Sequence, residues 1–399
     1  MAKWEVSGMK VLYIVGGEGN RYGSEIIAID LISAGKRNGI EYVVVTANKG
    51  AVSEACDQLG VENYVVPFRF FVYKAMSNPI LNLIKKTVWK TRAEHLTRRA
   101  VRVLEKKLDM KSFDLIHTNL SRDLLGGVLA ERNGIPHIWH IHELYKAHYQ
   151  LSFLRENQVK WMSEHADKFI AISKTVADEW IKSGLPREKV EIIYNGIDVS
   201  NVEPKNTWNN DIRLKLVMVG HIVPPKGQAQ AIKGLSTLPK EVKKHITLDC
   251  YGEGTKKYKA ELQQLARDLD VNLSLKGYCA EVGKVLKEYD IGINYSRGEG
   301  FGLSTVEYMA AGICPVVANT GANEELIEDG KNGFVFNYDD INTFAEVLNQ
   351  LFLDREMLIN ASNVAMVDAN SKYSLVNMEH LIFSIYDNVG NRRVLYETD

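Results

Sequence analysis

Short aliphatic and β-branched runs alternate with longer amphipathic stretches along most of this 399-residue sequence. The stretches 24–38, 79–108 and 174–183 have the apolar spacing of helices. Strands that alternate with helices form right-handed crossovers, which build a parallel sheet covered on both faces. The sequence therefore predicts an α/β fold, with strands in the first half at 11–15, 41–46, 63–66, 114–117, 137–141, 168–172 and 190–194.

The alternation is interrupted at the polar segment 198–211, which contains Pro204 and, after it, three asparagines. It restarts with predicted strands at 214–219, 246–250, 272–275, 291–294 and 314–317. A chain of this length is also too long for one ordinary core. We therefore expect two doubly wound, Rossmann-like domains, with these bounds: 1–200, a linker at 201–211, 212–375, and a helix at 376–399 that returns to the first domain.

Composition excludes several classes of protein. Lys and Arg number 49 against 50 Asp and Glu, so the net charge of −1 indicates no nucleic-acid partner. No apolar run approaches the length of a spanning helix, and the residues before the first strand lack the pattern of a signal peptide. The four cysteines have no metal-type spacing. These features favour a cytoplasmic protein with reduced cysteines.

A glycine-rich segment that includes Gly17 follows the first predicted strand. Glycines there let backbone N–H groups approach an anion at the start of the next helix, so Gly17 is a candidate for phosphate binding. A dinucleotide site would need a glycine where Tyr22 stands and an acid at the end of the second strand, which finishes in Thr46-Ala47. The segment argues against an NAD site, and a turn without chemical use is the alternative.

Two candidate cations, His221 and Lys226, lie in the loop after the first strand of the second domain. A diphosphate leaving group needs such charge because negative charge grows on it as the glycosidic bond breaks. Alone, however, one lysine at a helix start is more often a solvated side chain. The loop becomes informative only together with a second cluster.

That second cluster contains Glu299 and Glu307 on either side of a glycine-rich turn that enters a helix. We expect Glu299 to pack against nothing and to face a bound sugar, with Glu307 about one turn inside the helix. Two carboxylates beside an anion site are costly unless hydroxyl groups donate to them, as sugars and riboses do. The alternative is a loop charge and half of a surface ion pair. Further donor-binding candidates lie in the turn, where free amides can hold phosphate oxygens: Gly300, Phe301, Gly302 and Leu303.

Together these motifs resemble the retaining glycosyltransferases of GT-B fold, family 4 (glycosyl transferases group 1), over nearly the whole sequence. The family hallmark is two glutamates separated by seven residues, which Glu299 and Glu307 match with Gly-Phe-Gly between them. Other matching stretches are Asn195-Gly196-Ile197-Asp198, Ser173 at a strand end, Gly23-Ser24-Glu25 and Gly312-Ile313-Cys314-Pro315-Val316-Val317.

The resemblance implies two Rossmann-like domains that face each other across a cleft. It also implies sugar transfer from a UDP- or GDP-linked donor to a glycan or lipid-linked acceptor, in polysaccharide or glycolipid synthesis. Lys226 would bind the donor diphosphate, Glu299 the sugar hydroxyls and Glu307 the ribose. His142 matches the family histidine that touches the donor sugar and is, with Glu299, the candidate catalytic residue. The acceptor would attack the donor's own face with phosphate as base, so neither a cofactor nor a metal is implied.

Two departures from the family pattern stand beside these matches. His221 replaces the usual arginine, and an imidazole carries only part of a positive charge at neutral pH. Asn119 replaces the second histidine of a His-x-His motif, and we assign it with Tyr22 to the acceptor side. Two other functions stay open: a catalytically silent GT-B scaffold or glycan-binding partner subunit, and a nucleotide-sugar epimerase, which would need acid and base carboxylates in the first domain.

The segment from Lys74 to Lys111 holds eleven Lys and Arg against three acids, a net charge of +8, so the rest of the chain carries −9. Its apolar residues have helical spacing, and aromatic residues precede it at 68–73. A basic face of this kind suits an anionic inner leaflet, which would make the protein peripheral to the cell membrane. The alternative is a solvated helix whose apolar stripe packs on the sheet, and we expect the stripe to pack in either case.

Overall fold

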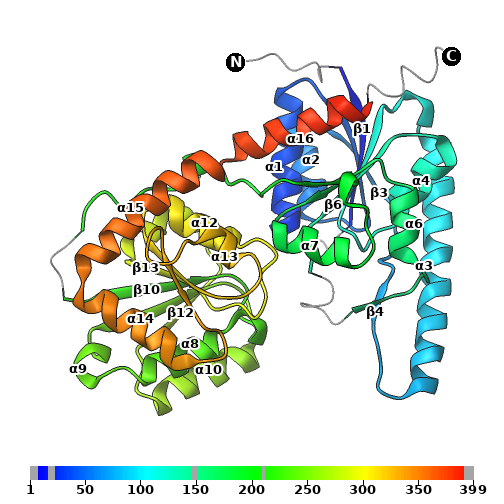
Figure 1. The fold of residues 1–399 in the computed structure, drawn as a ribbon. Helices are drawn as coiled ribbons and strands as arrows, with labels where there is room; N and C mark the ends of the chain where they lie inside the picture. Colours follow the sequence, from blue (N-terminus) through cyan, green and yellow to red (C-terminus); the bar gives the residue numbers. More distant parts are fainter. Residues whose placement is uncertain (1–7, 17–22, 145–150, 209–211, 391–399) are drawn as a thin grey trace. The chain divides into compact units, whose positions relative to one another are not determined.

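The computed structural model describes residues 8–16, 23–144, 151–208 and 212–390. The chain divides into two compact units, Met1–Asn195 with Val376–Asp399 (unit 1) and Gly196–Leu375 (unit 2). Each unit contains its own parallel sheet with helices packed against it (Figure 1). The expected class, α/β with two Rossmann-like domains, is confirmed.

The division between the units falls at Asn195 and Gly196, and not in the segment 201–211 where the sequence placed a linker. The reason lies in Lys205, whose ammonium donates to the Asp290 carboxylate (2.8 Å) and to the Tyr289 carbonyl (2.7 Å). Its backbone N–H also donates to the carbonyl of Ala311. These bonds make the described part of that polar segment belong to unit 2.

The sheet of unit 1 has the strand order β3-β2-β1-β5-β6-β8-β9, and all its neighbours are parallel. The chain runs outward from β1 through β2 to β3 and then continues on the other side of β1 with β5. The carboxyl ends of β1 and β5 are therefore the topological switch point, where doubly wound sheets bind ligands. The strands are β1 Lys10–Val15, β2 Glu41–Thr46, β3 Glu62–Val65, β5 Leu115–Asn119, β6 His137–Ile141, β8 Lys168–Ala171 and β9 Val190–Ile192.

The helices of unit 1 include one that comes from the far end of the chain. This is α16, Leu375–Gly390, whose Tyr386 hydroxyl lies 2.5 Å from His117 Nδ1 and 3.3 Å from the Tyr42 hydroxyl. All three side chains are buried, so α16 contributes to the interior of unit 1. The other helices are α1 Gly23–Arg37, α2 Ala51–Leu59, α3 Pro79–Lys107, α4 Leu125–Asn133, α6 Gln158–Glu164 and α7 Lys174–Lys182.

Helix α3 starts at a proline that needs no N–H partner, and the Asn78 side chain before it accepts from the next two amides. Its second half is buried through Ala93, Ala100 and Leu104, whereas the apolar residues of its first half are exposed. The expectation that the whole apolar stripe packs is therefore wrong for the first half. No helix among the described residues is long and apolar enough to cross a membrane.

The sheet of unit 2 has the order β12-β11-β10-β13-β14-β15, again parallel throughout, with its switch point between β10 and β13. Its strands are β10 Leu214–Val219, β11 Ile246–Tyr251, β12 Leu273–Gly277, β13 Ile291–Asn294, β14 Cys314–Ala318 and β15 Phe334–Phe336. Its helices are α8 Gln228–Ser236, α9 Lys240–Lys243, α10 Lys256–Asp268, α11 Val282–Val285, α12 Leu303–Ala310, α13 Asn323–Leu326, α14 Ile341–Leu353 and α15 Arg355–Lys372.

Three strands were not expected from the sequence. In unit 1, β4 (Val72–Lys74) and β7 (Leu151–Phe153) form a small antiparallel pair, and in unit 2 β15 extends the sheet by one strand. Each is three residues long, which is too short for an alternation pattern to stand out from the surrounding loop.

Candidate functional site

The loops that follow β10 and β13 meet at the switch point of unit 2. The loop after β10 carries His221 and ends in the short 3₁₀ helix Pro224–Lys226, and the loop after β13 carries Glu299. A backbone hydrogen bond of 2.8 Å, from the N–H of Arg297 to the carbonyl of Pro225, joins the two loops. The sequence placed His221, Lys226 and Glu299 in two separate loops, and the structure brings these loops together.

Two glycines make the close approach possible. Gly227 has φ +75° and lies so near the loop after β13 that a Cβ there would be 2.1 Å from the carbonyl oxygen of Tyr295. Gly321 has φ +60°, and a Cβ there would lie 2.1 Å from the carbonyl oxygen of Glu299. Any larger residue would push these backbones apart. The segment that carries Glu299 is thus held from two sides.

Lys226 and Glu299 form an ion pair, with 2.8 Å between Nζ and Oε2. The Glu299 side chain is 15% exposed and the Lys226 side chain 36%. The expectation that Glu299 packs against nothing is therefore wrong, because the carboxylate has a cationic partner. The pair places an ammonium group, which can bind an anion, beside a carboxylate, which can accept hydrogen bonds from hydroxyl groups.

Helix α12 begins immediately after this loop, with Gly302 (φ +103°) as its N-cap and Leu303 as its first residue. Because the N-cap residue is a glycine, it has no side chain that could accept hydrogen bonds from the first amides of the helix. The N-terminus of a helix also carries a partial positive charge. Gly300 and Phe301 precede it and are buried, with the Phe301 ring 5.9 Å from that of Tyr373. The turn can therefore hold an anion such as phosphate.

Glu307 lies farther along α12 and is partly buried. Burial raises the pKa of its carboxyl group to about 7 from an ordinary 4.5, since a charged carboxylate is poorly solvated there. At neutral pH the group is thus divided between acid and carboxylate. A ligand hydroxyl that donates to it would favour the ionised form.

A buried amide cluster beneath the loop was missed by the sequence reasoning. Asn294, the last residue of β13, donates through Nδ2 to Thr305 Oγ1 (2.9 Å) and to Asn323 Oδ1 (3.2 Å), and its own Oδ1 accepts from the N–H of Ser296 (3.2 Å). These bonds connect the loop to α12 and α13. The available signal was a polar residue at the end of an otherwise apolar strand.

His221 is exposed, and its carbonyl accepts a hydrogen bond from Gln228 Nε2 at 3.0 Å. The residue before it is Gly220, whose φ of +137° turns the chain away from the end of β10. The backbone at His221 is therefore held in place by the start of α8.

In unit 1, Asn119 is the last residue of β5 and His142 directly follows the neighbouring strand β6, and the two side chains lie in contact. His142 Nε2 is 2.8 Å from Asn119 Oδ1, and Asn119 Nδ2 donates to the carbonyl of Ser24 at 3.1 Å. The amide oxygen therefore faces the ring, so Nε2 carries the hydrogen and Nδ1 is the acceptor. Burial, with the neighbouring rings of His140 and His117 and the Arg122 guanidinium, holds the pKa of His142 well below its usual range. The ring is neutral at physiological pH.

Glu143 holds the His142 loop and was also missed. Its carboxylate accepts from the N–H of His142 (3.0 Å) and of Ser121 (3.4 Å), and it pairs with Arg122 at 3.3 Å. The side chain is only 4% exposed. Nothing in the sequence distinguishes this glutamate from a surface charge, because its partners come from the loop after another strand.

His117, the first residue of the stretch in which Asn119 replaces the second histidine, is a packed core residue. It lies 4.5 Å from the ring of Tyr13 and stacks on His140 at 5.4 Å, ring centre to ring centre. Burial lowers the pKa of His117 well below its ordinary value and that of His140 to about 3. Both rings are neutral, and His140 lies between the rings of His117 and His142.

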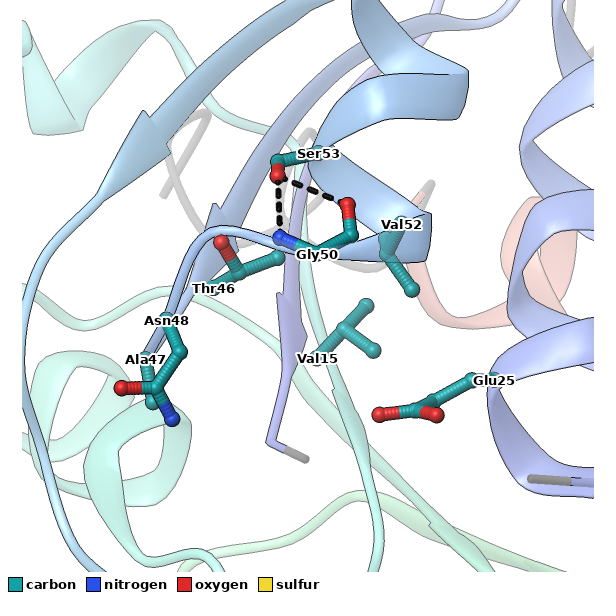
Figure 2. Close-up of a pocket in the computed structure, with 8 residues that line it drawn as sticks. All are labelled: Val15, Glu25, Thr46, Ala47, Asn48, Gly50, Val52 and Ser53. Atoms are coloured by element: carbon teal, nitrogen blue, oxygen red, sulfur yellow. Dashed lines mark hydrogen bonds between the residues drawn. The ribbon is translucent and has the colours of Figure 1, made fainter. Parts of the chain in front are cut away.

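Gly17 and Tyr22 lie outside the described residues. At the carboxyl ends of β1 and β2 is a cavity of about 10 Å³ (Figure 2). Glu25, Thr46 and Asn48 contribute to its lining, and Ser53 Oγ exchanges hydrogen bonds with the backbone of Gly50. The cavity has room for about one water molecule. It is far too small for a nucleotide.

Within the described ranges, no group of three or more His, Cys, Asp or Glu side chains is arranged to hold a metal ion.

The chain matches two known families over adjoining segments. Glycosyl transferases group 1 matches residues 201–365, and Glycosyltransferase Family 4 matches residues 22–201. One relative is the UDP-Gal:alpha-D-GlcNAc-diphosphoundecaprenol alpha-1,3-galactosyltransferase of Escherichia coli, 24% identical over 292 residues, which are 65% of this chain and 72% of that enzyme. Another is the poly(ribitol-phosphate) alpha-N-acetylglucosaminyltransferase of Staphylococcus aureus, 32% identical over 47% of this chain and 37% of that enzyme.

Among solved structures, HepE of Anabaena in complex with UDP and glucose has the same fold. The TM-score is 0.76 and the sequence identity 21%, and the superposition covers 95% of this chain and 100% of HepE.

Proposed function

Because the chain belongs to the family 4 glycosyltransferases of GT-B fold, we propose that it transfers a sugar from a UDP-sugar to a glycan or lipid-linked acceptor. We propose further that the transfer retains the anomeric configuration and needs no metal. The names of two relatives give their acceptors, GlcNAc-diphosphoundecaprenol for one enzyme and poly(ribitol-phosphate) for the other. The same chemical class of acceptor is proposed here.

The observation that carries the proposal is the Lys226–Glu299 pair at the N-terminus of α12. A nucleotide sugar presents a diphosphate next to a ring of hydroxyl groups. Lys226 and the free amides of α12 match the diphosphate, and the Glu299 carboxylate matches the hydroxyls. As the glycosidic bond breaks, charge grows on the diphosphate, so cations and amides fixed in advance stabilise the transition state.

Glu307 is proposed to accept hydrogen bonds from the ribose of the donor. Its raised pKa fits a carboxyl group that is poorly solvated until hydroxyls reach it. A uridine base is supported by HepE, which binds UDP, and by the Escherichia coli enzyme, whose donor is UDP-galactose.

His142 is proposed to accept a hydrogen bond from a sugar hydroxyl through Nδ1. The ring is neutral and Asn119 fixes its tautomer, so Nδ1 keeps its lone pair at physiological pH. In retaining transfer the acceptor oxygen attacks the donor face from which the diphosphate leaves, and a donor phosphate oxygen takes the acceptor proton. The sugar carbon exchanges one C–O bond for another, and UDP departs with the proton.

The test measures UDP affinity by calorimetry and sugar transfer with labelled UDP-sugars. Lys226→Ala removes a charge-assisted contact, so we expect UDP binding to weaken by about 1.5–3 kcal/mol and transfer to fall with it. The control is Lys205→Ala, which breaks a 2.8 Å ion pair with Asp290 at the amino end of β13, opposite to the end that carries the Glu299 loop. The Lys205–Asp290 pair is more buried than the Lys226–Glu299 pair. If UDP affinity fell only because unit 2 was destabilised, the fall would therefore be larger in Lys205→Ala.

Wild-type affinity and turnover in Lys226→Ala would refute the donor site. UDP binding without transfer to any glycan or lipid-linked acceptor would favour the silent scaffold. Interconversion of the sugar on an intact UDP-sugar would favour an epimerase.

A further inference from the structure

The first half of α3 presents an apolar face to solvent. Ile80 is 70% exposed, Leu83 is 64% and Val88 is 58%, and Leu81 and Ile84 between them are half exposed. A helix on the surface of a protein normally turns such residues inward. Figure 1 shows this half of α3 extending beyond the sheet of unit 1, with β4 beside it. We refer to Ile80, Leu81, Leu83, Ile84 and Val88 as the outer face of α3.

The opposite side of the same helix segment is polar and faces the protein. Asn82 Nδ2 donates to the Tyr73 hydroxyl (3.3 Å), and its Oδ1 accepts from the N–H of Met76 (2.9 Å). Lys86 pairs with Glu156 at 3.7 Å, and the Arg69 guanidinium lies 4.3 Å from the ring centre of Trp89.

Residues three or four positions apart lie on the same side of a helix. From Trp89 onward, that side of α3 carries the buried residues Ala93, Thr97, Ala100 and Leu104. One continuous side of α3 thus faces unit 1 over its whole length. In the first half the sequence gives that side polar residues and leaves the apolar ones outside. The exposure of the outer face is therefore set by the packing of the whole helix and not by fraying of its end.

The charge around the outer face has one sign. From Lys74 to Arg92 the chain has five Lys and Arg and no Asp or Glu. Lys90 and Arg92 lie on either flank of the outer face and form no ion pair with any described residue. Lys85 and Lys86 are turned toward the protein, where Lys85 donates to the carbonyl of Lys74. An apolar strip flanked by cations is complementary to a layer that has an apolar interior and anionic groups at its surface.

We propose that the outer face of α3 docks the protein on an anionic lipid surface. The segment from Pro79 to Arg92 is about 21 Å long at 1.5 Å per residue, and it would lie in the plane of the interface. Its leucine, isoleucine and valine side chains would enter the boundary between headgroups and acyl chains, and Lys90 and Arg92 would meet lipid phosphates.

A second copy of the chain fits the same surface poorly. In a twofold dimer the same patch lies on both partners, so the cations that flank the outer face would meet like charges. The inference does not depend on the proposed donor chemistry, because binding to lipid needs neither donor nor acceptor.

The experiment is vesicle sedimentation of the full chain. Vesicles of phosphatidylcholine are compared with an equal mixture of phosphatidylcholine and phosphatidylglycerol. We expect binding to the anionic vesicles alone, and loss of most binding in about 0.5 M salt, where charges are strongly screened. Leu83→Glu with Val88→Glu should lower the partition coefficient more than about tenfold. The matched control is Leu353→Glu with Val376→Glu, the same residue types at 73% and 71% exposure on other helices, which should bind like wild type.

A second pair of variants separates local from overall charge. Lys90→Glu with Arg92→Glu should lower the partition coefficient at least about 25-fold, since the loss of each cation near the lipid alone costs about fivefold. Arg99→Glu with Lys106→Glu makes the same change of net charge at exposed positions in the second half of α3 and should have a much smaller effect.

Light scattering on every variant reports the oligomeric state, and circular dichroism reports folding. Absence of wild-type sedimentation with anionic vesicles at low salt would overturn the proposal. So would equal losses in the target and control pairs, or a wild-type dimer that Leu83→Glu with Val88→Glu converts to a monomer without changing lipid binding.

Discussion

The raised pKa of Glu307 leads to a pH dependence whose sign can be worked out in advance. If donor hydroxyls bind only the carboxylate, affinity follows its ionised fraction. With a pKa of about 7 that fraction is about three quarters at pH 7.5 and about 3% at pH 5.5. The affinity for UDP-glucose should therefore fall about 25-fold between these pH values, or about 1.9 kcal/mol. UDP-glucose is the appropriate ligand because its diphosphate does not titrate in this range.

The stability of the free protein should change with pH in the opposite direction. The folded pKa of Glu307 lies above the ordinary 4.5, so the native state binds the proton more tightly than the unfolded chain. This contribution to stability is present below pH 4.5 and is lost as pH rises to 7, by at most about 3 kcal/mol. Rising pH should thus strengthen donor binding while it lowers the free energy of unfolding of the ligand-free protein. Few other titratable groups would produce both effects.

Calorimetry tests the binding part directly. Titrations with UDP-glucose in two buffers of different ionisation enthalpy should show release of about 0.8 proton at pH 6.5. Glu307→Gln should abolish both the proton release and the pH dependence. Glu253→Gln, an exposed side chain on the loop after β11, should leave both unchanged.

An affinity that stays constant from pH 5.5 to 7.5 would refute the assignment of Glu307 to a ligand hydroxyl. A Glu307→Gln protein that keeps the wild-type pH dependence would do the same.

Two further predictions concern the tautomer of His142 and the absence of a metal. Asn119→Ala removes the acceptor that fixes His142 Nε2–H, so kcat should fall about tenfold while the affinity for UDP, measured by calorimetry, stays at the wild-type value; a matching loss of UDP affinity would contradict this positioning role. EDTA should leave the rate of sugar transfer unchanged, and activity restored only by added Mg²⁺ or Mn²⁺ would contradict a metal-independent reaction.

The sequence predicted the sheets well because buried parallel strands are continuous apolar runs with polar ends. The bounds of β2, β6, β10 and β13 are those expected, and the two Rossmann-like domains follow from the alternation of strands and helices. The same reasoning missed β4, β7 and β15, since three residues do not form a pattern.

The direction of α3 could not be predicted from its sequence. Helical spacing shows that Leu81, Ile84 and Val88 share a face, but it does not show which face the rest of the chain covers. The structure turns that face outward because residues later in the helix, such as Ala93 and Leu104, pack on unit 1 and fix its rotation. Tertiary packing thus determines which face of α3 is exposed, and the local sequence pattern does not.

For the candidate site, the sequence selected residues but not their contacts. Glu299 and Lys226 were chosen from separate loops, and their ion pair depends on β10 and β13 being neighbours in the sheet. Glu143 was missed because its partners in the loop after β5 are far from it in the sequence, and Asn294 was missed although a polar residue at the end of an apolar strand is a signal. The roles of His142, Glu299 and the donor-binding residues stay predictions.

The position of α16 has a consequence for synthesis on the ribosome. Unit 1 needs Tyr386 for its interior, so the first unit to begin emerging is the last to be completed. Unit 2, residues 196–375, lies entirely between the two parts of unit 1 and can fold first. At about 5–20 residues per second, translation of this insert takes about 10–40 s. During that time the nascent unit 1 exposes the groove that α16 will fill, and a chaperone that shields apolar surface would find its substrate there.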